Sequence, residues 1–120
     1  MKVFSDAWNK KFTYLWNESP AACCAMKSAG AIKFTKTDDD RAEVVFFWDD
    51  DGKVSQQEAQ PDERVPSFLA SNDNWNDFLN KKIEAKRAVM VNRIRYRGPM
   101  RFAITYGPSL NWVAQIWVVD

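Results

Sequence analysis

The sequence contains no histidine, and this absence narrows the chemistry that is open to the protein. Without imidazole there is no Ser-His-Asp or Cys-His nucleophile, no histidine metal ligand and no side chain that ordinarily titrates near neutral pH. The remaining tyrosines, lysines and carboxylates show no spacing typical of an active site, and a glycine-rich phosphate loop is missing. We therefore expect a protein that is not an enzyme and that uses no metal and no cofactor.

Cysteine is also scarce, because the only two cysteines are the neighbours Cys23 and Cys24. Adjacent cysteines cannot close a structural loop, and two thiolates without histidine are too few for a zinc site. We interpret them as two small buried thiols in an alanine-rich helix. A redox-active vicinal pair is the alternative.

Long apolar runs are absent as well. No run approaches the roughly 20 residues that a membrane span needs, and the first residues lack the apolar segment of a secretory signal. The length of 120 residues is usual for one domain. The contents of 46% apolar and 14% aromatic residues exclude intrinsic disorder. We expect one intracellular, cytoplasmic domain over residues 1–120.

Charge is unevenly distributed, although the formal net charge is only +1. Residues 38–63 carry ten acidic and two basic side chains, whereas residues 81–101 carry eight basic side chains against Glu84 alone. The basic segment can favour phosphate head groups, an acyl-CoA, an anionic membrane or nucleic acid. The alternative is a solvated face that pairs with the acidic loops.

The spacing of apolar residues changes between a period near 3.6, typical of helices, and a period of 2, typical of strands. Capping residues, prolines and acidic turns mark the boundaries. Helices are predicted over residues 3–17, 20–29, 72–81, 84–91, 99–106 and 109–119, and strands over 31–37, 41–48, 53–60, 65–70 and 93–97.

Because the strands come in a run instead of alternating with helices, we expect an α+β domain. Its five-stranded, mostly antiparallel sheet should carry helices on one face. The strand over 41–48 should be central, since Val45 and Phe47 on its second face are apolar too. The strand over 65–70 should lie at an edge, since Pro66 cannot donate a ladder hydrogen bond.

Residues 67–100 resemble the C-terminal half of the sterol carrier protein 2 family. The segments that carry the resemblance are SFLAS, WNDFL, KIEAKRAVM and RIRYRGPM. Asn80 and Asn92 stand where the family usually has glycine, and asparagine is the next-best residue for a left-handed backbone. Gly98 stands at the family's glycine after the basic strand, and the earlier elements fit the family layout over nearly the whole chain.

The resemblance implies a sheet and helices that enclose an apolar tunnel for one lipid, which is a sterol, fatty acid, fatty acyl-CoA or phospholipid. It brings no catalytic residue, and some members are accessory or dimerising modules of larger enzymes. We therefore expect non-catalytic lipid binding or transfer by a monomer or weak homodimer that touches membranes transiently.

A site for an acyl chain needs an apolar cavity and not a filled core, and large aromatic residues can form its walls while methionine adapts to different ligands. The alternative for each such residue is a place in the ordinary core. The candidates for lining it are Phe34, Phe46, Trp48, Phe68, Trp75, Phe78, Met90, Met100, Ile104, Leu110, Trp112, Val113 and Ile116. The candidates for contact with an anionic head group are Arg93, Arg95 and Arg97, which can alternatively form a solvated sheet face. The helix after the Gly107-Pro108 break carries two tryptophans and either closes the core, moves as a lid or docks on a membrane interface.

Two other functions compete with lipid binding. One is an accessory or dimerisation module without a free ligand. The other is a nucleic-acid-binding module that uses residues 81–101. Its weakness is that the arginines at 93–97 alternate with Ile94 and Tyr96 on opposite faces, whereas stacked bases need basic and aromatic side chains on one face.

Overall fold

The computed structural model describes residues 2–58 and 65–117. The elements follow one another along the chain as expected, with boundaries that shift by a few residues. They are α1 (Asp6–Asn17), α2 (Pro20–Ala25), β1 (Gly30–Lys36), β2 (Glu43–Trp48), β3 (Val54–Gln57), β4 (Ser67–Ala70), α3 (Asn72–Leu79), α4 (Ala85–Met90), β5 (Arg95–Arg97), α5 (Met100–Tyr106), the 3₁₀ turn η1 (Pro108–Leu110) and α6 (Asn111–Ile116).

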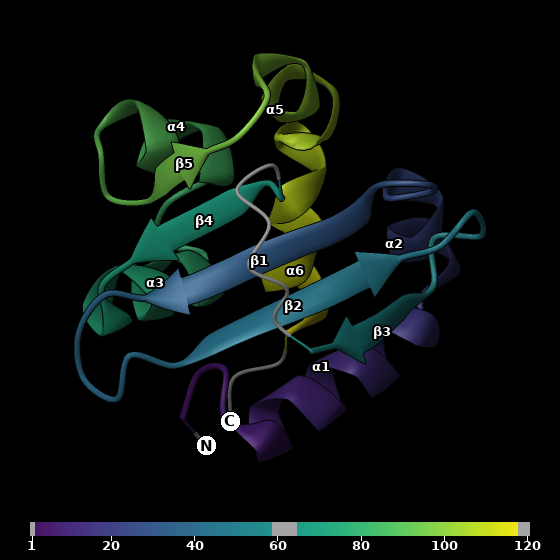
Figure 1. Ribbon diagram of the computed structural model, residues 1–120, viewed down its shortest axis with the longest axis horizontal. Helices are drawn as coiled ribbons and strands as arrows, with labels where there is room; N and C mark the ends of the chain where they lie inside the picture. Colours follow the sequence, from purple (N-terminus) through teal and green to yellow (C-terminus); the bar gives the residue numbers. More distant parts are fainter. Residues whose placement is uncertain (1, 59–64, 118–120) are drawn as a thin grey trace.

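The five strands form one mixed sheet in the order β3-β2-β1-β4-β5. β1 and β4 pair in parallel, and the other three pairs are antiparallel. Figure 1 shows α1, α3 and α6 behind one face of the sheet, while α4 and α5 stand beside β5 at its edge. The predicted α+β class and the mostly antiparallel sheet are confirmed.

The prediction that the strand over 65–70 lies at an edge is wrong. β4 lies between β1 and β5, so the two edge strands are β3 and β5. Pro66 precedes the strand, and its carbonyl accepts a hydrogen bond from the Lys33 amide at 2.9 Å. Its missing N–H therefore interrupts no ladder bond. β2 is an interior strand between β3 and β1, with Val45 on its second face buried, but the central strand of the sheet is β1.

Local capping explains two of the shifted helix boundaries. α1 begins at Asp6 and not at residue 3, because Ser5 is the N-cap and its Oγ accepts from the Trp8 amide at 3.2 Å. After α3 the left-handed residue is Lys81, with φ of 62°, whereas Asn80 stays right-handed at φ of −84°. The expectation that Asn80 supplies the left-handed turn is therefore wrong. Asn92, with φ of 60°, does supply it after α4.

The core is a continuous layer of aromatic rings between the sheet and the helices. Phe12 of α1 packs on Phe46 of β2 with 4.8 Å between ring centroids, and Phe34 of β1 lies 5.9 Å from Trp75 of α3. The buried Trp75 indole donates to the Thr35 carbonyl at 2.9 Å, so its polar atom is satisfied. Aromatic side chains therefore fill the interior.

The helix after the Gly107-Pro108 break, α6, packs against this core together with Trp117. Trp117 stacks on Trp8 with 4.6 Å between centroids, and the Lys11 ammonium lies over the Trp117 ring, 5.0 Å from its centroid. Leu110 and Val113 are buried in the same core. The last residues of the helix predicted over 109–119 lie outside the described residues.

The two cysteines lie in different environments. Cys23 is buried, its Sγ lies 3.5 Å from the Trp16 carbonyl, and burial raises the pKa of its thiol. Cys24 is exposed, so the prediction of two buried thiols is wrong for this residue. Within the described residues, no group of histidine, cysteine and carboxylate side chains is placed to hold a metal ion. None of the described helices is both long and apolar enough to cross a membrane.

Candidate functional site

An apolar hollow lies at the β5 edge of the sheet, between α4 and α5 and outside the aromatic core. Its volume is about 380 Å³. The residues that line it belong to β4, α4, β5, α5 and η1, together with Gly107, which precedes η1. They are Phe68, Ala85, Lys86, Val89, Met90, Tyr96, Ala103, Ile104, Gly107, Pro108 and Leu110. We call this hollow the α4–α5 groove. Apart from the Lys86 side chain and the Tyr96 hydroxyl, its lining side chains are apolar.

Small residues create the space in this groove. Ala85 and Ala103 face it from the two helices, and Gly107 stands at its end. Met90 and Ile104 also line it but are largely exposed to solvent, so the groove is open on this side. An apolar hollow that opens to solvent between two short helices can admit an apolar chain.

Hydrogen bonds at both ends of α4 fix this wall of the groove. The helix has no side-chain cap from Glu84, but Asn111 Oδ1 of α6 accepts from the Ala85 amide at 2.8 Å. At the other end, the amides of Asn92 and Arg93 donate to Val89 and Ala88 carbonyls at 3.2 and 2.8 Å. This pair of bonds is the Schellman motif, which requires the left-handed backbone of Asn92.

Tyr96 forms the floor where the groove meets the sheet. Its ring packs on Phe68, with centroids 5.0 Å apart, and its hydroxyl donates to the Pro99 carbonyl at 2.7 Å. Burial raises the pKa of the Tyr96 phenol, so at neutral pH the hydroxyl stays a hydrogen-bond donor. Phe102 of α5 stacks on the same ring.

The space between sheet and helices, which we expected to be a tunnel, is occupied by side chains. Two voids found there measure about 10 Å³ each, which is too small for an acyl chain. Six candidate lining residues are buried in this core: Phe34, Phe46, Trp48, Trp75, Phe78 and Val113. Trp112 and Ile116 are half-buried and pack against it.

Four of the candidates do meet in the groove. They are Phe68, Met90, Ile104 and Leu110. Met100 is exposed on α5 and is not part of the lining. Sequence reasoning about the site missed Lys86, Tyr96 and the small residues. A usable signal was the spacing of four that puts Lys86 and Met90 on one face of α4.

The three arginine candidates lie outside the groove lining. Arg95 and Arg97 are exposed on β5, on either side of Tyr96 in the alternating strand. Arg93 pairs with Asp77, with 3.6 Å between Nη1 and Oδ2. Arg93 also lines a second, polar hollow of about 330 Å³, together with Lys82, Ile83, Arg87 and Val91.

No protein-family model and no curated protein matches this sequence, but solved structures do. The crystal structure of sterol carrier protein 2 matches with a TM-score of 0.75 at 17% identity, over 95% of both chains. Apo sterol carrier protein 2 from Yarrowia lipolytica gives 0.58 at 16% identity, over 97% of this chain and 94% of that one. The ubiquinone synthesis protein UbiJ-SCP2 gives 0.64 at 7% identity, over 92% and 91%. The chain therefore has the sterol carrier protein 2 fold.

Proposed function

We propose that the protein binds one lipid with a single apolar tail in the α4–α5 groove and catalyses no reaction on it. The observation that carries this proposal is the groove itself, an apolar hollow of about 380 Å³ with Lys86 as its charged lining residue. Ligand pockets usually measure about 300 to 1,000 Å³. A volume near the lower limit suits one acyl tail better than the two tails of a phospholipid.

The apolar lining can supply enough free energy for this. Each methylene removed from water contributes about 0.8 kcal/mol, so ten methylenes contribute about 8 kcal/mol before the costs of association. The costs of association reduce this sum, so the affinity is weaker than the dissociation constant near 1 μM that a net value of about 8 kcal/mol would give. Lys86 is placed to attract an anionic head group, such as the carboxylate of a fatty acid.

The comparisons support a lipid ligand, since sterol carrier protein 2 recurs among the similar structures. Transfer of that lipid between membranes in the cytoplasm is part of the proposal. The groove is suited to exchange because its lining residues Met90 and Ile104 are in contact with solvent.

A second candidate function is an accessory module without a free ligand. The filled aromatic core favours it, because the space between sheet and helices holds no lipid-sized cavity among the residues described. The similarity to a ubiquinone synthesis protein, UbiJ-SCP2, is consistent with a role beside an enzyme.

Native mass spectrometry of the protein purified from cells, with titration of a dansyl-labelled undecanoic acid, tests lipid binding. Ala103→Trp fills the groove and should weaken binding of this fatty acid at least tenfold, by about 1.4 kcal/mol. Ala7→Trp on the exposed face of α1 is the matched control and should leave it unchanged. Ile104→Asp, at an exposed lining position, repeats the test without filling the interior.

Protein that carries no lipid and ignores the labelled fatty acid would overturn the proposal and favour the accessory module. Equal effects of Ala103→Trp and Ala7→Trp would show that any bound lipid lies elsewhere. Circular dichroism of each variant shows whether it is folded.

A further inference from the structure

The α4–α5 end of the molecule exposes a cluster of large aliphatic side chains. Met90, Met100 and Ile104 are 72%, 73% and 73% exposed, and Val91 is 49% exposed. Among the residues described, the other large hydrophobic side chain with comparable exposure is Tyr14 on α1. Single exposed apolar residues are ordinary, but a cluster on one end of a protein marks an interaction surface.

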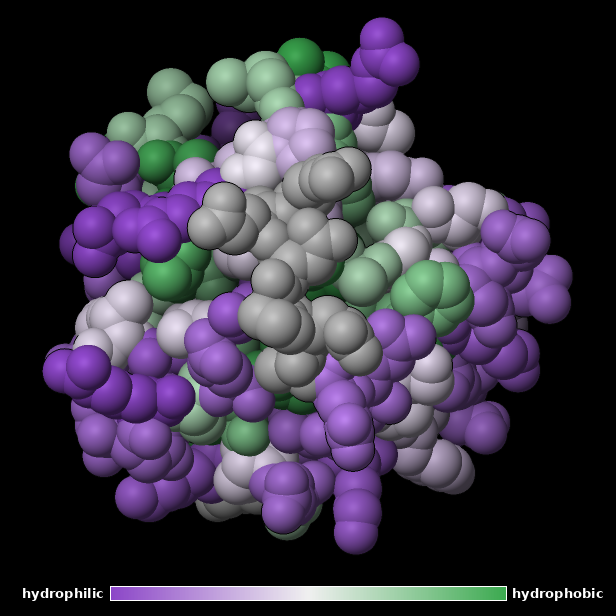
Figure 2. Space-filling view, in the orientation of Figure 1, coloured by the Kyte–Doolittle hydropathy of each residue, from purple (hydrophilic) through white to green (hydrophobic). Residues whose placement is uncertain are grey.

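The fold places these residues on both sides of the groove. Met90 and Val91 end α4, whereas Met100 and Ile104 lie one turn apart on the same face of α5. Figure 2 shows hydrophobic side chains at the top of the molecule, where α4 and α5 lie, with strongly hydrophilic ones beside them. The aliphatic side chains therefore form a broken rim around the groove.

The charged side chains on these two helices are cations. Lys86, Arg87 and Arg101 are exposed on the same two helices, and none of them forms an ion pair with another described residue. The polar hollow lined by Arg87 and Arg93 adjoins the groove across α4. The acidic turns at residues 38–40 and 49–51 lie at the ends of β1 and β2, away from this end (Figure 1).

We propose that the α4–α5 end docks on the surface of an anionic lipid bilayer, with Met90, Met100 and Ile104 inserted among the lipids. The cations beside them would contact the lipid phosphates. An anionic bilayer presents both features that this surface matches, because its headgroups carry negative charge and an apolar layer lies directly beneath them. The groove then opens toward the membrane.

Charge decides between the bilayer and the other occupants. A symmetric contact between two copies would bring together two surfaces from segments with eight basic and one acidic residue each, and like charges repel. A nucleic acid would be attracted by the cations but offers nothing to exposed methionine and isoleucine side chains. The inference goes beyond lipid binding in the groove and does not require it.

Vesicle flotation tests the docking surface, with vesicles of phosphatidylcholine alone or mixed with phosphatidylglycerol. We expect binding to the mixed vesicles that weakens as salt is raised. Each cation near an anionic surface changes the partition coefficient of the protein onto the vesicles about fivefold. The double variant Arg87→Gln/Arg101→Gln removes two cations and should therefore reduce vesicle binding roughly 25-fold. Lys10→Gln/Lys53→Gln makes the same change in net charge on exposed residues elsewhere and should have little effect.

The aliphatic contribution has its own matched pair. Met100→Ser should reduce vesicle binding about tenfold, because it removes a side chain that enters the apolar layer. Tyr14→Ser is the matched control, because it removes a large exposed side chain from α1, and it should leave vesicle binding unchanged. The residues changed in these variants do not line the groove, so uptake of the dansyl-labelled fatty acid should persist. If Ala103→Trp loses uptake of the fatty acid but still floats normally with the vesicles, lipid binding in the groove and docking on the membrane are separate properties.

Three results would overturn the docking proposal. One is equal binding to both kinds of vesicle, or to neither. Another is self-association in sedimentation velocity that Met100→Ser abolishes, which would make a second copy the occupant. The third is a salt-sensitive affinity for an oligonucleotide that exceeds the affinity for vesicles and falls with the arginine variant.

Discussion

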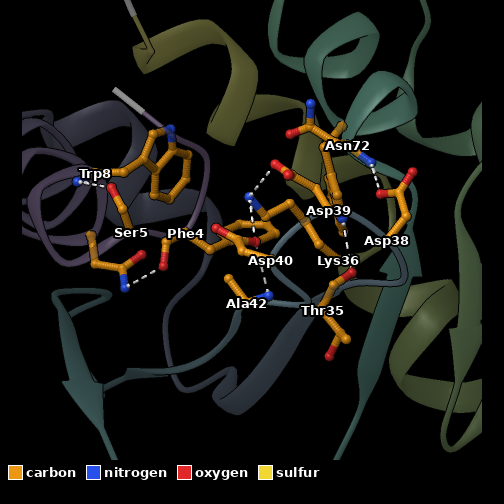
Figure 3. Close-up of polar contacts among 12 residues, drawn as sticks. Phe4, Ser5, Trp8, Thr35, Lys36, Asp38, Asp39, Asp40, Ala42 and Asn72 are labelled. Atoms are coloured by element: carbon orange, nitrogen blue, oxygen red, sulfur yellow. Dashed lines mark hydrogen bonds and ion pairs between the residues drawn. The ribbon is translucent and has the colours of Figure 1, made fainter.

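Lys36 and Asp40 form an ion pair across the turn between β1 and β2, with 2.8 Å between Nζ and Oδ1. The Lys36 side chain is fully buried on the core face of β1, whereas Asp40 is partly exposed (Figure 3). Asp39 lies farther away, with 3.9 Å between its Oδ2 and Lys36 Nζ. In the same turn Asp38 Oδ1 accepts from the Asn72 amide at the start of α3. The acidic run thus has structural partners.

Removal of the anion should harm the protein more than removal of the cation. Asp40→Asn keeps the shape and the acceptor for the Ala42 amide, but it leaves the buried ammonium without its nearest charge. Lys36→Met removes the buried charge itself and leaves behind only Asp40, which is partly exposed and can be hydrated, so no uncompensated buried charge remains. We expect the melting temperature of Asp40→Asn to fall below that of Lys36→Met. Asp51→Asn, in an exposed turn, is the control, and the reverse order would contradict this interpretation.

The same pair predicts an acid-dependent part of stability. The hydrogen bond from Lys36 holds the pKa of the Asp40 carboxyl below its ordinary value, which is about 3.9. A depressed pKa stabilises the fold fully above the unfolded value, and this contribution is lost as pH falls through the folded pKa. Urea unfolding at a series of pH values should therefore show the gap between the native protein and Asp40→Asn shrinking below about pH 4. A gap that stays constant to pH 2 would exclude this linkage.

Gly52 lies in the turn between β2 and β3, where this turn packs closely against the backbone of α2. Its φ is +77°, and a Cβ there would lie 1.8 Å from the Cys23 carbonyl oxygen. Its own carbonyl accepts from the Trp16 indole at 2.9 Å. Gly52→Ala should thus cost about 3 kcal/mol or more, since a strained backbone is combined with a backbone clash.

Gly30→Ala separates the two causes of that loss. Gly30 has nearly the same φ, +79°, but nothing lies within 4 Å of an added Cβ. This variant should cost only about 1 kcal/mol, the price of a left-handed alanine. Equal losses in urea unfolding would mean that the approach of Cys23 to Gly52 is unimportant.

Local patterns predicted the elements well, because each element here has its own apolar period. The alternation of Ile32 and Phe34 with Lys33 and Thr35 corresponds to buried and half-buried positions of β1. Strand order depends on a contact that no local pattern encodes. β4 adds in parallel to β1 through the pairs Phe34–Phe68 and Lys33–Ser67, so a rule based on Pro66 alone gave the wrong edge.

The site was harder to predict because a cavity is a property of the space between side chains. The sequence search favoured large rings such as Phe46 and Trp48, but these interlock with α1 and fill the core. The groove exists where the side chains are small, at Ala85, Ala103 and Gly107. Such residues do not stand out in a sequence.

The end of α3 offers a direct test of where a glycine belongs. The amides of Lys81 and Lys82 donate to the Phe78 and Asp77 carbonyls at 3.1 and 2.9 Å, a Schellman motif in which Lys81 is the left-handed residue. Lys81→Gly should raise the free energy of unfolding by roughly 1 kcal/mol, because glycine adopts this backbone without strain. Asn80→Gly should not raise it, since Asn80 has a right-handed backbone. A gain for Asn80→Gly alone would place the left-handed residue at 80.

Gly98 lies close to Tyr96, which forms the floor of the groove. Gly98 has φ of +151°, and an added Cβ would lie 2.6 Å from the Tyr96 hydroxyl oxygen and 3.0 Å from Pro66 Cα. The hydroxyl cannot move freely, since it donates to the Pro99 carbonyl. Gly98→Ala should therefore cost about 2 kcal/mol, and Tyr96→Phe about 1 kcal/mol through the lost hydrogen bond.

The double variant shows whether the hydroxyl causes the clash. Tyr96→Phe removes the atom nearest to the new Cβ, so Gly98→Ala/Tyr96→Phe should cost less than the two single losses together, by about 0.5 to 1 kcal/mol. Gly30→Ala combined with Tyr96→Phe is the control and should be additive, because nothing lies within 4 Å of a Cβ at Gly30. Additivity in both double variants would mean that the backbone at Pro66, and not the tyrosine, limits position 98. In that case Gly98→Ala should also leave the affinity for the dansyl-labelled fatty acid unchanged, since Tyr96 would keep its place in the lining.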